Sequence, residues 1–124
     1  DTLVDVVCGN GIFVGVGLHG LRMATRDGLV WEGRQAGEEG EHLNSVLWAG
    51  DRFVAVGQGA TYVSPDGLAW TRHVNTEPPQ VAAWSDGLFV GIAWKGRILV
   101  SKDGVAWEQV HKAAHHLEAV AARV

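Results

Sequence analysis

Short apolar runs alternate with glycine-containing turns along this chain, and their spacing predicts β-strands. The middle of the chain shows the pattern best, with runs at 43–48, 52–56, 60–64 and 68–73 separated by turns that contain glycine. Runs of this length, rich in Val, Phe and Trp, are typical of strands. No segment holds an apolar period near 3.6 residues that would predict a helix, so we expect an all-β protein.

The pattern [Ser/Thr]-x-Asp-Gly-x-x-Trp occurs three times, with its tryptophans 39 and 37 residues apart. A second motif precedes each copy: apolar runs at 12–17, 52–57 and 88–93 follow turns that contain Asn-Gly, Gly-Asp or Asp-Gly. Asn-Gly and Asp-Gly are strong hairpin signals. The residues that define the three copies are Thr25, Asp27, Gly28 and Trp31, then Ser64, Asp66, Gly67 and Trp70, then Ser101, Asp103, Gly104 and Trp107.

A repeated four-stranded unit of about 40 residues is the size of a β-propeller blade. The repeat predicts blade 1 at 1–41, blade 2 at 42–78 and blade 3 at 79–115, with the first strand of a further blade at 116–124. Three blades in an open arc would expose apolar blade faces at both ends. We therefore expect either a homo-oligomer, with a six-bladed dimer as the simplest case, or other blades supplied by a longer chain.

The [Ser/Thr]-x-Asp-Gly-x-x-Trp turn resembles the Asp-box, or BNR repeat, of sialidase-like propellers. The usual box is Ser-x-Asp-x-Gly-x-x-Trp, and the copies here lack the residue between Asp and Gly. In such a turn the Asp carboxylate can accept hydrogen bonds from unpaired backbone N–H groups, with help from the Ser or Thr hydroxyl. The Trp can pack between blades. Three equal copies favour a structural role for the box residues over a catalytic or metal-binding one.

The resemblance also implies where a ligand would bind, on the face formed by the loops between blades (D–A) and between the second and third strands of each blade (B–C). The B–C loops are expected at 18–20, 58–59 and 94–96, and the D–A loops at 34–42, 74–80 and 111–116. Trp94 breaks the repeat, and an exposed Trp beside a Lys could stack on a sugar or face a protein. The candidate ligand-binding residues are Trp94, Lys95, His19 and Gln58.

Charge and composition narrow the function classes. The net charge is −4 and no Lys/Arg stripe is present, which argues against nucleic-acid binding. No apolar stretch reaches the ~20 residues of a membrane span. The single cysteine, Cys8, is expected to be a buried thiol. The histidines near 111–116 and the acidic run 38–41 are expected in solvated loops, so no metal and no cofactor are predicted. The compartment stays open, secreted and periplasmic locations included.

Resemblance to sialidases would imply an arginine cluster and a Tyr nucleophile paired with an acid. The only tyrosine, Tyr62, takes the slot of Met23 and Leu99 in the repeat, which is a core slot. We therefore predict a non-enzymatic scaffold or protein-interaction module that assembles through its blades. Two alternatives stay open: a carbohydrate-binding, lectin-like propeller, and a fragment of a glycoside hydrolase-like propeller whose catalytic residues lie outside this chain.

Overall fold

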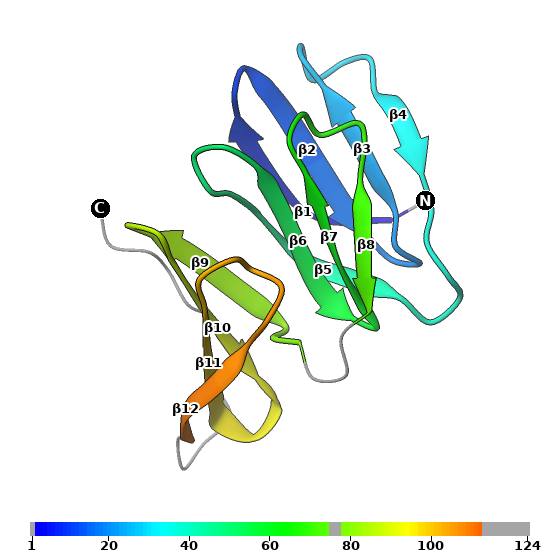
Figure 1. Ribbon diagram of the computed structural model, residues 1–124. Coiled ribbons are helices and arrows are strands. Elements are labelled where there is room, and N and C mark those ends of the chain that lie inside the picture. Colours follow the sequence, from blue (N-terminus) through cyan, green and yellow to red (C-terminus); the bar gives the residue numbers. More distant parts are fainter. Residues whose placement is uncertain (1, 75–77, 113–124) are drawn as a thin grey trace.

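The computed structural model describes residues 2–74 and 78–112, which form three four-stranded antiparallel sheets. Each sheet is a meander in which sequential strands are neighbours, and we refer to the sheets as blades 1, 2 and 3 (Figure 1). The strands are β1 (Leu3–Gly9), β2 (Ile12–Gly17), β3 (Arg22–Thr25), β4 (Glu32–Gln35), β5 (His42–Trp48), β6 (Phe53–Gln58), β7 (Ala60–Ser64), β8 (Thr71–Val74), β9 (Val81–Ser85), β10 (Leu88–Ala93), β11 (Arg97–Ser101) and β12 (Glu108–Lys112). A single 3₁₀ turn, η1 (Trp94–Gly96), follows β10.

Tight turns join the first two strands of each blade. Asn10 and Gly11 both have positive φ (51° and 78°), and so do Asp86 and Gly87 (51° and 80°). Glycine tolerates these angles without steric cost, and Asn or Asp tolerates them better than other residues. The predicted Asn-Gly and Asp-Gly hairpins are therefore present at both positions.

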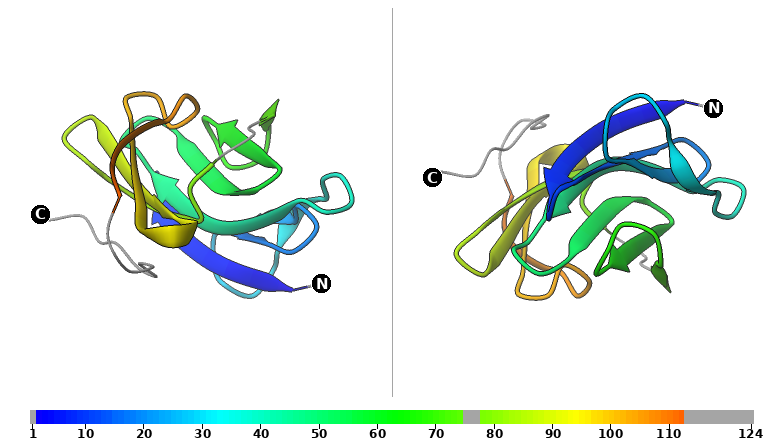
Figure 2. Two further views of the ribbon diagram at one scale, coloured as in Figure 1. Left: turned by 90° about the horizontal axis from the view of Figure 1, so that it is seen from below. Right: turned by 90° about the horizontal axis from the view of Figure 1, so that it is seen from above.

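The first strands of the blades lie next to one another, because β1 contacts β5 and β5 contacts β9 (Figure 2). Hydrogen bonds between strands of different blades fix this arrangement. Asp5 Oδ2 accepts a 2.9 Å bond from the backbone N–H of Val46, and Ser45 Oγ lies 3.4 Å from both backbone polar atoms of Ala82. Asp5 and Ser45 hold equivalent positions, since each pairs with a matching valine of the second strand. The contact between successive blades is thus repeated.

The two blade junctions hold the hydrophobic core. At the first junction, Val14 and Val16 of blade 1 pack with Phe53 of blade 2, and Trp48 covers this cluster. At the second junction, valines of β6 pack with Phe89, and Trp84 and Trp107 cover them. Apolar burial between sheets therefore stabilises the order of the blades as well as each sheet.

The predicted strand positions differ from the observed ones mainly in the fourth strand. The run 68–73 was expected to be a strand, but β8 begins at Thr71. The N–H groups of Leu68 and Ala69 donate to the Asp66 carboxylate instead of to a neighbouring strand, which delays the strand by three residues. The expected extra strand at 116–124 lies outside the described residues. The sheets span 3–35, 42–74 and 81–112.

No helix of membrane-spanning length and apolarity occurs within the part of the chain that the structure describes.

Candidate functional site

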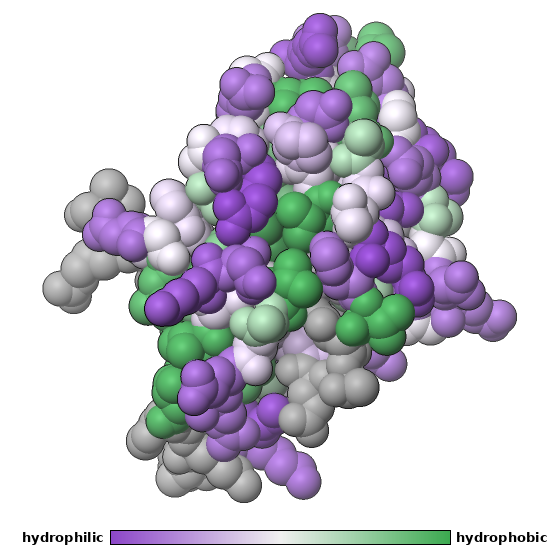
Figure 3. Space-filling view, in the orientation of Figure 1, coloured by the Kyte–Doolittle hydropathy of each residue, from purple (hydrophilic) through white to green (hydrophobic). Residues whose placement is uncertain are grey.

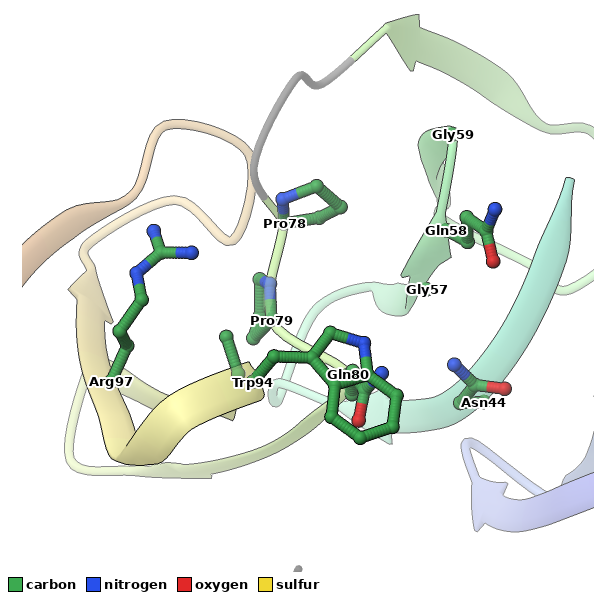
Figure 4. Close-up of a pocket in the computed structure, with 10 residues that line it drawn as sticks. Asn44, Gly57, Gln58, Gly59, Pro78, Pro79, Gln80, Trp94 and Arg97 are labelled. Carbon is green, nitrogen blue, oxygen red and sulfur yellow. The ribbon is translucent and has the colours of Figure 1, made fainter. Parts of the chain in front are cut away.

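A groove of about 420 Å³ opens between blades 2 and 3, where the predicted B–C and D–A loops meet. Its walls come from the end of β6, from the segment before β9, and from η1 (Figure 4). The lining residues are Asn44, Gly57, Gln58, Gly59, Pro78, Pro79, Gln80, Ala93, Trp94 and Arg97. The groove therefore combines three side-chain amides, two prolines, an indole and a guanidinium.

Local backbone geometry shapes the walls of this groove. A Cβ added to Gly57 would lie 1.9 Å from the backbone oxygen of His42, so only glycine fits there. A Cβ added to Gly91 would lie 2.4 Å from Pro79, which shows how closely that proline packs on β10. Gly57 thus lets the start of β5 approach β6, and Gly91 lets Pro79 pack on β10, which places Pro79 at the groove.

Trp94 is the most exposed aromatic residue of the groove, with 64% of its surface accessible. It starts the 3₁₀ turn η1, where Lys95 has a positive φ of 65°. Figure 4 shows the indole projecting from the end of β10 over the groove, with Asn44 and Gln58 on the opposite wall. An exposed indole among amide groups offers a stacking surface beside hydrogen-bond donors and acceptors.

The structure brings together two of the four candidate ligand-binding residues. Gln58 and Trp94 line the same groove, whereas His19 and Lys95 do not. The ring of His19 packs against that of His42 at 5.3 Å between centroids, and the His19 backbone N–H donates to His42 Nδ1 at 3.3 Å. His19 therefore belongs to the neighbouring loop contact between blades 1 and 2.

Three residues that line the groove with polar side chains were absent from the sequence-based candidates: Asn44, Gln80 and Arg97. Asn44 lies on β5 at the irregularity of the strand register between Leu43 and Ser45. Arg97 begins β11, and its Nε donates to Gln109 Oε1 at 2.9 Å. The signal for Asn44 was a polar residue inside a first strand, and the signal for Gln80 was its place in the predicted D–A loop 74–80. Arg97 carried no such signal.

The acidic run 38–41 was predicted to be a solvated loop, and this is wrong for Glu41. Glu41 is only 3% exposed and belongs to a buried polar cluster. Its Oε1 accepts a 2.5 Å hydrogen bond from the Tyr62 hydroxyl, and its Oε2 accepts two from the Arg72 guanidinium. The Arg22 guanidinium lies 3.9 Å from the centre of the Tyr62 ring. A buried carboxylate needs such partners, and the local sequence does not reveal them.

The side chains of this cluster shift one another's pKa values. Burial would raise the pKa of Glu41, but hydrogen bonds from Arg72 and Tyr62 outweigh it and hold that pKa below its usual range. Burial, together with the bond to Glu41, raises the pKa of the Tyr62 hydroxyl. The same carboxylate raises the pKa of Arg72, whereas burial lowers that of Arg22.

Tyr62 and Glu41 form the kind of pair that a sialidase-like mechanism would need, but their burial argues against that use. Tyr62 is 2% exposed and its raised pKa keeps the phenol neutral. A nucleophile must reach its substrate, and the hydroxyl of a residue this buried is not accessible to one. The cluster instead joins the 38–41 segment and blade 1 to blade 2.

The three repeated turns share one hydrogen-bond pattern. In each, the Asp carboxylate accepts bonds of 2.8 to 3.0 Å from the N–H groups two and three residues later. The Ser or Thr hydroxyl donates to the same carboxylate and accepts from the N–H of the following glycine. These backbone bonds hold the pKa of Asp27, Asp66 and Asp103 below its usual value. The glycines have φ of 80° to 83°.

Cys8 was predicted to be a buried thiol, and this is wrong because the residue is exposed on β1. It stands where blades 2 and 3 have Trp48 and Trp84, which pair with the equivalent phenylalanines. No group of His, Cys, Asp and Glu able to hold a metal ion occurs among the described residues. His111 was expected in a loop but lies in β12, because this strand runs to Lys112; His115 and His116 lie outside the described residues.

The comparisons with known proteins identify the architecture. No protein-family model matches the chain, and no curated protein matches it. A solved structure described as YCF48 bound to D1 peptide is similar, with a TM-score of 0.70 and 24% identity. The match covers 87% of this chain and 39% of that chain, so this chain spans well under half of the YCF48 length. The likeness confirms the predicted all-β, β-propeller class, with three four-stranded antiparallel blades.

Proposed function

We propose that this chain is a non-catalytic protein-interaction module that assembles through its blades and binds an extended peptide in the groove between blades 2 and 3. The observation that carries the proposal is the exposed Trp94 indole facing the amides of Asn44 and Gln58 across one groove. The similar YCF48 structure contains a bound D1 peptide, so a propeller of this kind can serve as a peptide receptor.

The chemistry of the groove suits an extended peptide. Such a peptide presents unpaired backbone N–H and C=O groups, and a side-chain amide can both donate to and accept from them. Asn44, Gln58 and Gln80 supply three amides, and Trp94 supplies apolar contact area at low entropic cost. The proposed absence of catalysis is supported by the burial of Tyr62 and Glu41.

A displayed library of random peptides, panned against the full chain, tests the groove. Selected peptides should bind the wild-type chain in calorimetry and lose at least about tenfold in affinity to Trp94→Ala, because an aromatic anchor is removed. Leu18→Ala is the matched control, since Leu18 holds the same repeat position in blade 1 outside the groove. Selected peptides that bind Trp94→Ala as well as wild type would contradict the proposal.

A carbohydrate-binding role is the second candidate, because an exposed indole beside amide groups can also stack on a sugar ring. A glycan array probed with the wild-type chain and with Trp94→Ala separates the two. Glycan binding that depends on Trp94, with no peptide selected from the library, would favour the lectin-like function.

We also infer that the three repeated turns are shortened Asp-box turns. The support is their common hydrogen-bond pattern, in which one carboxylate and one hydroxyl satisfy the turn in each blade.

A further inference from the structure

One face of blade 1 is exposed although its counterparts in blades 2 and 3 are buried. We call this the leading face, the side that in blades 2 and 3 packs on the preceding blade. Phe13 is 42% exposed, whereas the equivalent Phe53 and Phe89 are fully buried. Val6 is 53% exposed, whereas the equivalent Val46 is almost fully buried. The leading face of blade 1 has the composition of a blade junction, but no described residue covers these side chains.

The repeated glycine shows what covers this face in the other blades. A Cβ added to Gly67 would lie 2.7 Å from Val14 of the preceding blade, and one added to Gly104 would lie 3.0 Å from Val54. A Cβ added to the equivalent Gly28 would meet no described atom within 4 Å. At each junction, a valine from the second strand of one blade therefore packs over the turn glycine of the next blade. No described valine packs over Gly28 in this way.

Blade 3 carries the complementary half, which we call the trailing face. Leu88, Val90 and Ile92 alternate along β10 at the positions of Ile12, Val14 and Val16 in β2. Leu88 is 41% exposed, whereas Ile12 is buried in the first junction. Leu88 and Val100 border a shallow depression that reaches the third turn. Apolar residues come to the surface of blade 3 in the space-filling view (Figure 3).

We propose that the leading face of blade 1 binds the trailing face of blade 3 from a second copy of this chain. The same pair of faces is already joined twice within the chain, at the junctions of blades 1 and 2 and of blades 2 and 3. The second-copy contact repeats this established junction a third time, with Val90 packed over Gly28 and Phe13 packed against Val90. Contiguous exposed apolar faces of this kind mark interaction surfaces.

The contact is head-to-tail, because two different faces meet. A head-to-tail contact produces a ring where the rotation closes and a longer series of copies where it does not. It also leaves the peptide groove free, because the groove lies between blades 2 and 3 and none of its lining residues belongs to either face. Failure of this contact and failure of peptide binding are therefore measured separately.

Light scattering after gel filtration of the full chain tests the contact. The wild-type chain should give a multiple of the monomer mass. Val6→Glu and Leu88→Glu should each weaken association by more than about tenfold, because an unpaired carboxylate would be buried at the junction. Val74→Glu is the matched control, an equally simple change at an exposed β8 valine that lies on neither face, and it should leave the mass unchanged.

A mixture of the two impaired variants distinguishes the head-to-tail contact from any symmetric one. Val6→Glu keeps an intact trailing face and Leu88→Glu an intact leading face, so the mixture should form a one-to-one complex that neither variant forms alone. A wild-type chain that stays monomeric up to about 1 mM would overturn the proposal. So would association that both variants retain, or a mixture that does not recover it.

Discussion

The Tyr62 hydroxyl lies 2.5 Å from Glu41 Oε1, and this bond ties the segment before blade 2 to the third strand of that blade. The other carboxylate oxygen of Glu41 accepts from the half-exposed Arg72 on β8. Arg22 of blade 1 covers the Tyr62 ring and donates to the backbone oxygens of Gly20 and Ala36. Blade 3 has Leu99 in the place of Tyr62, so the described part of blade 3 has no counterpart of the Tyr62–Glu41 bond. The second junction has a different polar contact, in which Arg52 Nη2 donates to the backbone oxygen of Asp103 at 3.1 Å.

Removing the carboxylate should destabilise the fold more than removing the hydroxyl. Glu41→Ala leaves the buried Tyr62 hydroxyl and the Arg72 guanidinium without their acceptor, and we expect a loss of about 2 to 3 kcal/mol in the free energy of unfolding. Tyr62→Phe removes one donor, and we expect a loss of about 1 to 2 kcal/mol. Urea denaturation measures both. Glu39→Ala, an exposed acid in the same segment, is the control and should change stability by less than about 0.5 kcal/mol.

The fold should lose stability in acid for an identifiable reason. The pKa of Glu41 is held below its ordinary value of 4.5 in the folded chain, and the pKa values of the three turn aspartates are held below 3.8. A lowered pKa in the folded state means that the ionised form favours folding. The contribution of these ionised carboxylates to the free energy of unfolding is fully present above about pH 5. It is lost as the pH falls through their pKa values in the folded state.

The pH dependence can be assigned by comparing variants. In urea denaturation between pH 7 and pH 3, Glu41→Gln should flatten the acid-side decline of the unfolding midpoint relative to wild type. Glu39→Gln should leave the decline as in wild type. A Glu41→Gln curve parallel to that of wild type would mean that the Glu41 carboxylate does not couple folding to protonation.

The turn aspartate should be a structural residue in each blade. Asp66→Ala leaves the N–H groups of Leu68 and Ala69 without an acceptor, as the loss of a helix N-cap does. We expect the free energy of unfolding to fall by about 1 to 2 kcal/mol. Asp66→Asn keeps an acceptor oxygen and should cost less than half as much. Lys102→Ala, an exposed change in the third turn, serves as the control in the same thermal melts. Equal stability of Asp66→Ala and wild type would refute the hydrogen-bond account of the turn.

The strands and turns could be predicted from the sequence because they depend on local chemistry. β7 has the predicted bounds because the residues that limit it, Gly59 and Pro65, directly flank it in the sequence. The fourth strand of blade 2 was placed too early because side-chain acceptance by Asp66 competes with the sheet for the N–H groups of Leu68 and Ala69. Such competition is not visible in apolar periodicity.

The sites depended on contacts that no local pattern encodes. Gln58 and Trp94 could be found because they occupy equivalent positions in the repeat, which the fold brings to one face. Glu41 was read as solvated because its partners Tyr62 and Arg72 lie 21 and 31 residues away. Cys8 was expected to be buried because it sits in an apolar run, but its face of blade 1 is uncovered.

The indole N–H groups of Trp70 and Trp107 should make opposite contributions to stability. Trp107 Nε1 donates to the backbone oxygen of Gly104 at 3.1 Å, whereas the buried Trp70 Nε1 has no hydrogen-bond partner among the described residues. Both tryptophans occupy the same position of the repeated turn, so Trp→Phe removes a similar apolar volume from each. The two substitutions differ mainly in the N–H group, which is satisfied in one turn and unsatisfied in the other.

We expect Trp107→Phe to cost about 1 kcal/mol more than Trp70→Phe, because only the former loses a hydrogen bond and only the latter removes an unpaired buried donor. Urea denaturation of the two variants and of wild type gives the difference directly, and the common cost of the lost ring area cancels in it. If Trp70→Phe proved the more costly change, the Trp70 N–H would be contributing to stability. The packing of Arg22 at 6.0 Å from its ring would then be the first contact to examine, with Arg22→Met in the same assay.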